Sequence, residues 1–478
     1  MQLLKKIICL SITLMLFTNV ISSQTNEKNR VIILSDIEAD PDDTQSFVRL
    51  FLYSNQIDIK GIVATTSCWH QNMINPISIE KIISAYDKIQ PNLLKHEASF
   101  PVAQDLLSVL KDGLPVYGMK GVGKGKDSEG SEWIIDVLEE KDDRPLWISV
   151  WGGVNTLAQS LYKIKKTKSK KEAKRLISKL RVYTISDQDD SGIWIRNNFP
   201  DLFYIVSPGD EYKNATWTGI NTFIKGIDNT TISNSWLEEN IQQDHGPLGA
   251  IYPDVAWGVE GDTPAFLSLI PNGLNESEHP EWGAWGGRYE LYIPDFSKTK
   301  DGSSIVPIAP ETRKIWTNAN DNYAPFIKKQ FGRSVVRDTL IFNDFKSTLW
   351  RWRDEFQNDF AARMDWCIKN YEDANHPPVP ILLHPDHITL KSGESFDLDA
   401  LDSTDPDGDN LSFMWFNYVE ESSYKKEIIL SAPNVHVANF TAPEVNKKET
   451  IHFILKLSDK GEPNLTRYKR VIVTVLPK

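Results

Sequence analysis

Apolar and polar positions divide the chain into two regions of different periodicity. Up to about residue 325, short apolar runs rich in β-branched residues alternate with stretches in which apolar side chains recur every three or four positions. The first pattern favours buried strands and the second favours amphipathic helices. Strands that alternate with helices predict an α/β fold, a mostly parallel sheet with helices on both faces. The predicted strands are 31–34, 59–65, 146–150, 180–184 and 202–206, and the predicted helices are 44–53, 77–89, 132–138 and 156–164.

The C-terminal part of the chain has a different pattern. Residues 340–372 favour a helix that closes the first domain, and a proline-rich linker at 376–380 follows it. Beyond the linker, short alternating runs succeed one another over roughly 100 residues, which favours an all-β immunoglobulin-like sandwich. We therefore expect one domain at 30–372 and a second at 378–478. The alternating runs are 388–390, 395–398, 411–416, 436–440, 450–457 and 470–476.

Residues 1–23 have the pattern of a secretory signal peptide. Lys5 and Lys6 precede an apolar stretch at 7–21, and the small residues Ser22 and Ser23 follow it. The stretch is too short for a comfortable membrane span, and no later stretch approaches the length of about 18 apolar residues that a span requires. We expect an exported protein, periplasmic or secreted, with no membrane-spanning segment.

The charge of the chain argues against nucleic acid as a partner. It has 65 acidic residues against 53 lysines and arginines, a net charge of −12, whereas binding to a phosphate backbone requires clustered basic residues. The one basic run, 165–175, is short, and we interpret it as the solvated face of a helix.

Five carboxylates follow the first predicted strand within eight positions. Side chains packed this tightly repel one another unless a cation lies among them, and Ca²⁺ prefers six to eight oxygen ligands. In open α/β sheets, ligands bind at the carboxyl ends of the strands. The segment therefore predicts a calcium site at this end of the sheet. The five carboxylates are Asp36, Glu38, Asp40, Asp42 and Asp43.

The spacing of this cluster resembles the N-terminal signature of nucleoside hydrolases, Asp-x-Asp-x-x-x-Asp-Asp. Three further segments resemble motifs of that family and occur in the same order. Four motifs in order are a stronger signal than any one of them alone. The segments are Asp36-x-Glu38-x-x-x-Asp42-Asp43, Gly61-Ile-Val-Ala-Thr65-Thr66, Trp151-Gly-Gly-Val-Asn155-Thr-Leu-Ala158 and Gly261-Asp262-Thr-Pro264.

More closely, the chain is similar to a bacterial nucleoside hydrolase-like family, some members of which are labelled cellulose-binding proteins. That family also carries the C-terminal immunoglobulin-like domain, so the resemblance covers nearly all of the chain after the signal peptide. Its further marks here are Asp127-Ser-Glu-Gly-Ser-Glu-Trp133, Ser186-Asp-Gln-Asp-Asp-Ser-Gly192 and Pro280-Glu-Trp-Gly-Ala-Trp-Gly-Gly-Arg288.

The resemblance to nucleoside hydrolases implies a set of metal ligands and two catalytic residues. In that family, carboxylates of the first cluster, a main-chain carbonyl and a late aspartate hold one Ca²⁺, which orients a water and the sugar hydroxyls. The carboxylate of Glu38 would take the proton of the water, and Asp42 would bond a sugar hydroxyl. Asp40 falls where the family has glycine, so it is left out of the ligand set. The implied ligands are Asp36, Glu38, Asp43, the carbonyl of Trp151, and Asp262.

The chain departs from nucleoside hydrolases mainly on the side of the sugar and the leaving group. Glu38 stands where they have aspartate, and their later ribose-binding segment is replaced by an acidic stretch at 187–190. Two tryptophans in a glycine-rich segment near Arg288 could form a stacking platform for a sugar. The substrate-binding candidates are Trp69, His70, Asp187, Asp189, Asp190, Trp194, Arg196, Trp285 and Arg288.

The sequence therefore predicts an exported, calcium-dependent hydrolase of a glycosidic bond, either the N-ribosyl bond of a nucleoside or an O-glycosidic bond of a carbohydrate. The alternative is a carbohydrate-binding protein that keeps the fold and the ion but does not hydrolyse. Nucleoside hydrolases are commonly oligomers, so a homo-oligomer is a further expectation. An aspartate-rich stretch at 402–409 fits either a second Ca²⁺ loop or an ordinary turn.

Overall fold

The computed structural model describes residues 27–295, 305–328 and 335–478. The predicted signal peptide lies outside these residues. Within them, no helix has both the length and the apolar composition that crossing a membrane requires.

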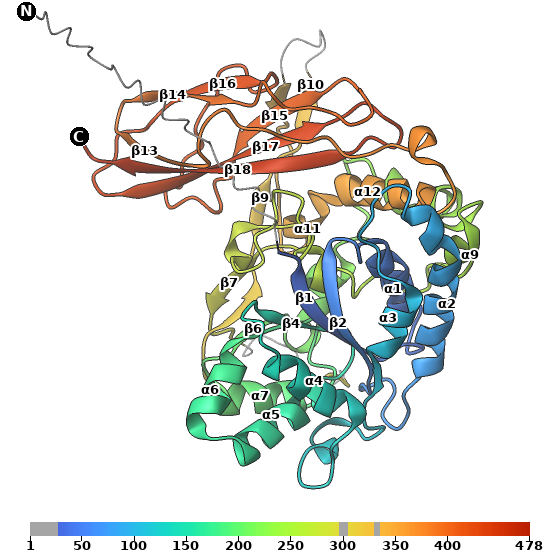
Figure 1. The fold of residues 1–478 in the computed structure, drawn as a ribbon. Coiled ribbons are helices and arrows are strands. Elements are labelled where there is room, and N and C mark those ends of the chain that lie inside the picture. Colours follow the sequence, from blue (N-terminus) through green and yellow to red (C-terminus); the bar gives the residue numbers. More distant parts are fainter. Residues whose placement is uncertain (1–26, 296–304, 329–334) are drawn as a thin grey trace, which may run out of the picture.

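An eight-stranded sheet with helices on both sides forms the larger part of the molecule (Figure 1). Its strands lie in the order β3-β2-β1-β4-β5-β6-β8-β7, and all neighbours are parallel except the last pair. The five predicted strands are confirmed, and β3, β7 and β8 extend the sheet. The strands are β1 Asn29–Ser35, β2 Ile57–Ala64, β3 Leu110–Asp112, β4 Leu146–Val150, β5 Leu180–Thr184, β6 Phe203–Val206, β7 Tyr289–Tyr292 and β8 Ile315–Asn318.

Strand β1 shows why both faces of the sheet are covered. Val31 and Ile33 pack into one apolar core together with α1 and α2, whereas Ile32 and Leu34 pack into a second core with α4, α5 and α7. Side chains alternate between the faces of a strand, so an unbroken apolar run can be buried only between two layers. The helices are α1 Asp42–Leu52, α2 Pro76–Leu93, α3 Ala103–Ser108, α4 Glu129–Glu139, α5 Asn155–Thr167, α6 Lys170–Ser178, α7 Ser191–Asn198, α8 Asn234–Leu237, α9 Gly246–Ala250, α10 Pro264–Leu267, α11 Ser347–Trp350 and α12 Arg353–Asp365.

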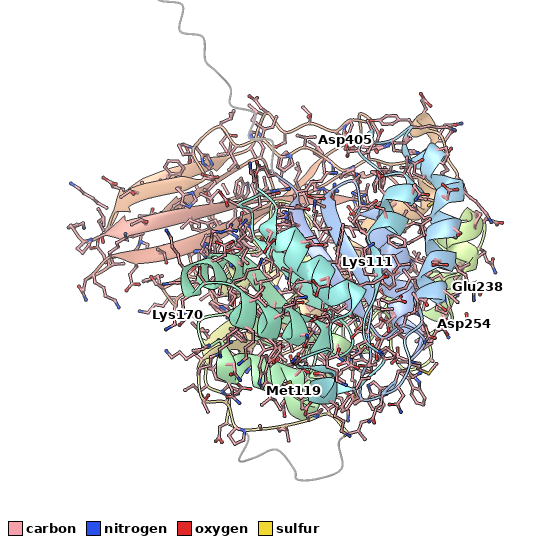
Figure 2. The ribbon with its side chains drawn as sticks, turned by 60° about the horizontal axis from the view of Figure 1, so that its bottom comes forward. Lys111, Met119, Lys170, Glu238, Asp254 and Asp405 are labelled. Carbon is pink, nitrogen blue, oxygen red and sulfur yellow. The ribbon has the colours of Figure 1, made fainter. Side chains whose placement is uncertain are left out.

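The basic run lies where α5 ends and α6 begins. Lys165, Lys166 and Lys170 are exposed there, and Lys170 lies at the rim of the molecule in Figure 2. Its position agrees with the interpretation of the run as a solvated helix face.

The prediction of one helix over 340–372 is wrong. The segment forms a short strand, β12, and two helices, α11 and α12, with a break at Trp352, whose φ of −109° and ψ of 6° leave the helical region. Trp352 packs against Tyr418 and Tyr468 of the C-terminal part of the chain, with ring centroids 6.1 and 5.7 Å away. Tertiary packing therefore overrides the local helical pattern. Short strands pair nearby as β10 with β11 and β9 with β12: β9 Asp321–Tyr323, β10 Phe326–Lys328, β11 Val335–Arg337 and β12 Phe342–Asp344.

The C-terminal part is all β, and all six of its predicted alternating runs form strands. A four-stranded sheet in the order β13-β18-β17-β15 and a two-stranded sheet of β14 and β16 enclose a common apolar core. Alternate residues of β17, such as Ile451 and Phe453, point into that core. The strands are β13 His387–Lys391, β14 Ser395–Asp399, β15 Ser412–Asn417, β16 Val437–Thr441, β17 Glu449–Ser458 and β18 Thr466–Leu476.

A buried ionic cluster joins the C-terminal sheets to the α/β part. Asp321 accepts hydrogen bonds from Arg288 Nε at 2.6 Å, from Arg351 at 2.7 Å and from the hydroxyl of Tyr418 at 2.7 Å. Trp285 is fully buried at the same contact, and its indole N–H donates to the hydroxyl of Tyr468 at 3.3 Å. The structure thus places Trp285 and Arg288 at the contact between the two parts, and not on a sugar platform.

A buried histidine at this contact, His452, predicts that the stability of the protein depends on pH. His452 on β17 is 3% exposed and lies beside Arg470 and the ring of Trp282. Burial and the Arg470 guanidinium lower the pKa of His452 to about 3, so the folded protein keeps the ring neutral. The unfolded chain, with an ordinary pKa of about 6.5, binds a proton below that pH. The contribution of His452 to the free energy of unfolding is therefore fully present above pH 6.5 and is lost as the pH falls toward 3.

For His452→Gln, which cannot titrate, we expect a smaller loss of stability on acidification. Between pH 7 and pH 5 the histidine accounts for about 2 kcal/mol of the wild-type loss. Urea unfolding at the two pH values measures the difference. Equal losses in the wild type and the variant would show that His452 titrates normally in the fold.

Candidate metal and substrate site

A cavity of about 370 Å³ opens at the carboxyl ends of three adjacent strands, β1, β4 and β5. A larger cavity, of about 790 Å³, lies at the contact of α11 and α12 with β15 and β17, where Lys456 and Glu355 pair with each other, and is not the candidate site. The smaller cavity is lined by Asp36, Ala39, Asp40, Asp42, Asp43, Trp69, Trp151, Ser186, Gln188, Tyr212, Lys213, Trp217, Trp257 and Asp262.

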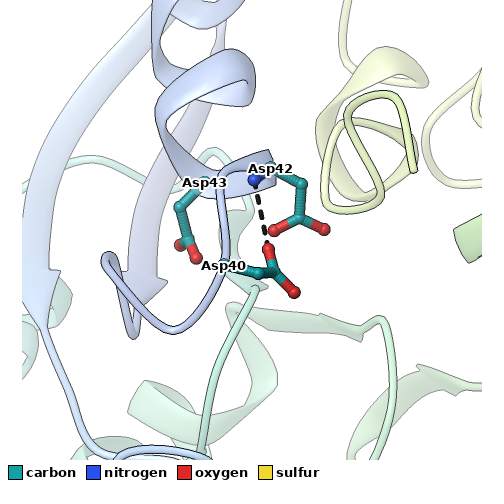
Figure 3. Close-up of side chains that lie close together, drawn as sticks. All are labelled: Asp40, Asp42 and Asp43. Carbon is teal, nitrogen blue, oxygen red and sulfur yellow. Dashed lines mark hydrogen bonds between the residues drawn. The ribbon is translucent and has the colours of Figure 1, made fainter. Parts of the chain in front are cut away.

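Three aspartates at the start of α1 form the centre of the site (Figure 3). One carboxylate oxygen from each of Asp40, Asp42 and Asp43 lies within 4.8 Å of the other two. The backbone N–H of Asp42 donates to Asp40 Oδ1 at 3.1 Å, which folds the Asp40 carboxylate back toward the helix. These three groups could hold a metal ion. The structure differs here from the sequence analysis, which left Asp40 out.

Hydrogen bonds fix the two helical carboxylates. The hydroxyl of Ser35, the last residue of β1, donates to Asp43 Oδ1 at 2.5 Å. The indole N–H of Trp217 donates to Asp42 Oδ2 at 3.2 Å. Both aspartates lie in the first turn of α1, where unpaired backbone N–H groups favour negative charge. The strand end and the helix start together aim the carboxylates into the cavity.

Asp36 and Asp262 bring two further buried carboxylates to the same cavity. Asp36 Oδ2 is buried and has no hydrogen-bond partner among the described residues. Glycines make room for these groups. A Cβ at Gly152 would lie 2.6 Å from Asp36 Oδ1, and one at Gly261 would lie 2.5 Å from Asp42 Oδ2. The backbone therefore approaches the carboxylates too closely for any side chain at these two positions.

The electrostatics of the cluster favour a bound cation. Burial raises the pKa of Asp36 to about 7, and burial together with the neighbouring carboxylates raises the pKa values of Asp42, Asp43 and Asp262 well above their usual range. Buried charges of one sign are costly without a partner. The oxygen donors, and the orphaned Asp36 Oδ2 among them, fit a hard divalent cation such as Ca²⁺.

The structure places Glu38 outside the cavity lining. Its backbone has a φ of 80°, which turns the side chain away, and the hydroxyl of Ser78 on α2 donates to Glu38 Oε1 at 2.5 Å. The side chain is exposed. In this conformation Asp40, rather than Glu38, completes the cluster with Asp42 and Asp43.

The carbonyl of Trp151, an expected metal ligand, accepts a hydrogen bond from the side-chain amide of Gln188. Both residues line the cavity. Gln188 holds the carbonyl at the end of β4 in place, and the sequence analysis had not assigned it to the site. Trp151 itself is buried and packs on Phe47 of α1, with ring centroids 4.6 Å apart.

Most of the acidic stretch after β5 holds the fold together instead of lining the cavity. Arg196 donates to both oxygens of Asp187 at 2.8 Å and also pairs with Glu311, all three buried. Asp189 accepts the N–H groups of Asn155 at 3.1 Å and Ser191 at 2.8 Å, and burial raises its pKa to about 7. Such groups have no free oxygen or guanidinium face for a sugar.

Two more candidates from the same stretch lie outside the lining. Asp190 accepts the N–H of Met119 at 2.8 Å, and Trp194 packs edge-on against Phe199. The expectation that Asp187, Asp189, Asp190, Trp194 and Arg196 bind substrate is therefore not supported by their placement. Ser186 and Gln188 are the members of this region that reach the cavity.

Aromatic side chains form much of the cavity wall. Trp69, a sequence candidate, lines it and is 50% exposed, whereas His70 next to it is not part of the lining. Trp257 lines the cavity and is 76% exposed, and Trp217 packs edge-on against Tyr212. Tyr212, Trp217 and Trp257 were missed because they come from the long connection between β6 and β7, which carries no local signal that places it over the strand ends.

Two family models match separate parts of the chain. Residues 30–289 match the family model for the nucleoside hydrolase-like domain of the cellulose-binding protein Sde182. The chain belongs to this family. Residues 395–475 match the model for the C-terminal domain of the cellulose-binding protein Sde0182. Both matches confirm the Sde182-like family that the sequence motifs indicated.

A solved structure covers nearly the whole molecule. It is a nucleoside hydrolase-related hypothetical protein from Saccharophagus degradans that is associated with carbohydrate metabolism. It is 36% identical, covers 94% of this chain and 100% of its own, and superimposes with a TM-score of 0.78. The PKD domain from the KIAA 1837 protein is 26% identical over 19% of this chain and 79% of its own, with a TM-score of 0.15. No curated protein matches the chain.

Proposed function

We propose that the protein is a calcium-dependent hydrolase of glycosidic bonds. The observation that carries the proposal is the convergence of buried carboxylates on one cavity at the ends of β1, β4 and β5, with Asp36 Oδ2 unpaired among the described residues. Aromatic walls over such a floor suit a sugar, whose ring faces are apolar and whose edges carry hydroxyls.

The residues that would hold the ion are among those that line the cavity. We assign this role to the carboxylates of Asp36, Asp40, Asp43 and Asp262 and to the carbonyl of Trp151. Bound there, Ca²⁺ supplies Lewis acidity to a water and to sugar hydroxyls. Calcium dependence is favoured by the all-oxygen donor set.

The other roles fall to the protein's own groups. Asp40 is partly exposed in the cavity, so a water can reach its carboxylate, and we assign it the acceptance of the water's proton. Asp42, held by the indole of Trp217, is placed to accept a hydrogen bond from a sugar hydroxyl. The ring of carboxylates favours the positive charge that develops on the sugar in an oxocarbenium-like transition state.

The departures from nucleoside hydrolases on the side of the sugar and the leaving group favour an O-glycosidic bond of a carbohydrate over the N-ribosyl bond of a nucleoside. The relative from S. degradans is associated with carbohydrate metabolism, and the family is described as cellulose-binding. Export to the periplasm or beyond, which the N-terminal pattern favours, would bring the protein to such polymers. The family description also supports a second candidate, a carbohydrate-binding protein without turnover.

The test is hydrolysis of oligosaccharides and nucleosides by the purified protein, with Ca²⁺ and after chelation. We expect products from a glycan with Ca²⁺ present, and none from Asp40→Asn or after chelation. Binding of glycans without cleavage of any substrate would favour the second candidate. Turnover that persists in Asp40→Asn and in chelator would contradict the proposed chemistry.

A further inference from the structure

Glu260 is a buried carboxylate two residues before Asp262 in an unusual backbone conformation. Its φ is 50°, in the left-handed region that favours glycine, and its side chain is fully buried. A non-glycine residue there costs free energy of the order of 1 kcal/mol, so the side chain must contribute something that glycine cannot. The hydrogen bonds of the Glu260 carboxylate show this contribution.

The carboxylate of Glu260 binds three groups at once. Arg49 of α1 donates from Nη2 to Oε1 at 2.9 Å and from Nε to Oε2. The hydroxyl of Tyr252 donates to Oε1 at 2.9 Å, and that of Thr263 donates to Oε2 at 2.9 Å. The guanidinium is itself held from α12, by the carbonyl of Phe356 at 2.9 Å and by the ring of Phe360, 4.0 Å from the centroid. Glu260 is thus the meeting point of α1, α12 and the segment that carries Asp262.

Two further contacts fix the same segment to α1. The backbone N–H of Glu260 donates to Gln45 Oε1 at 2.8 Å, and Thr263 Oγ1, whose proton goes to Glu260, lies 2.9 Å from the hydroxyl oxygen of Ser46. Between these anchors, Gly261 passes so close that a Cβ would touch Asp42 Oδ2. The helix that presents Asp42 and Asp43 therefore also sets the position of Asp262, through side chains one and two turns further along.

We propose that Glu260 is a positioning residue, which fixes Asp262 beside Asp42 and Asp43 through Arg49, Gln45 and Thr263 so that Asp262 and Asp43 meet one divalent cation. This inference rests on the proposed function, because it assumes that the cluster binds Ca²⁺. It concerns a group that touches neither ion nor substrate. Partners behind metal ligands typically contribute 10- to 100-fold in metal affinity.

The experiment measures the Ca²⁺ dissociation constant of the full chain by calorimetry. For Glu260→Gln we expect binding weaker by about 10- to 100-fold. Glu260→Gly, which relieves the backbone strain but also lacks the carboxylate, is expected to show the same loss. If Glu260→Gln fails to fold, the double variant Arg49→Met, Glu260→Gln, which removes both charges, is measured in its place.

Asp321→Asn is the matched control. It disturbs a buried ionic cluster of the same kind at the contact with the C-terminal sheets. We expect it to lower the melting temperature without changing the Ca²⁺ affinity. An affinity equal to wild type in Glu260→Gln and Glu260→Gly, or an equal loss in Asp321→Asn, would overturn the positioning role. Absence of Ca²⁺ binding by the wild type would instead overturn the proposed function, and this inference with it.

Discussion

Replacing Asp43 by Asn is expected to have opposite effects on stability with and without Ca²⁺. Without the ion, Asp43 is a buried carboxylate among others, and its neutral isostere removes repulsion, so the variant should unfold at a higher temperature than wild type. With Ca²⁺ at about 100 times its dissociation constant, the free energy of unfolding of the wild type should rise by about 2.7 kcal/mol. The variant binds Ca²⁺ more weakly and should not show this gain. Thermal unfolding with and without Ca²⁺ measures both effects.

Asp189→Asn is the control for this prediction. Asp189 is equally buried near the cavity and also has a raised pKa, but it accepts backbone N–H groups and does not line the cavity. An asparagine keeps only one of the two acceptor oxygens, so this variant should be less stable than wild type without Ca²⁺, but it should gain as much stability from Ca²⁺ as wild type does. If Asp43→Asn keeps the full Ca²⁺ effect, Asp43 is not a ligand.

Replacing Arg49 by Met is expected to cost about 3–5 kcal/mol in the free energy of unfolding. The change leaves Glu260 as a buried charge without its cation and removes the stacking on Phe360. Urea unfolding gives the magnitude, and Arg49→Met with Glu260→Gln in one chain should recover part of it, since both charges are then gone. A cost below about 1 kcal/mol would show that solvent or a rearranged partner neutralises Glu260.

The fold could be predicted because its strong patterns are local. The apolar run of β1 can be buried only between two layers, and the alternating apolar residues of β17 point into the core of the sandwich. The prediction for 340–372 failed because the break at Trp352 depends on the rings of Tyr418, directly after β15, and Tyr468 on β18, which are more than 60 residues away.

The site was predictable only as far as one chain segment defines it. Carboxylates directly after β1 had to lie at the strand end, and Asp42 and Asp43 do line the cavity. Which neighbour joins them depends on the φ of Glu38, a backbone detail that the composition of the segment does not specify. Asp187 and Arg196 show the opposite difficulty, because charged residues that pair with each other in the interior have the same sequence pattern as charged residues in a pocket.

The most direct test of the central claim is a calorimetric titration of the metal-free wild-type protein with Ca²⁺, alongside Asp43→Asn. We expect saturable binding at a single site in the wild type and its loss in the variant. Absence of saturable binding in the wild type, or binding that the variant retains unchanged, would contradict the assignment of the carboxylate cavity as a metal site.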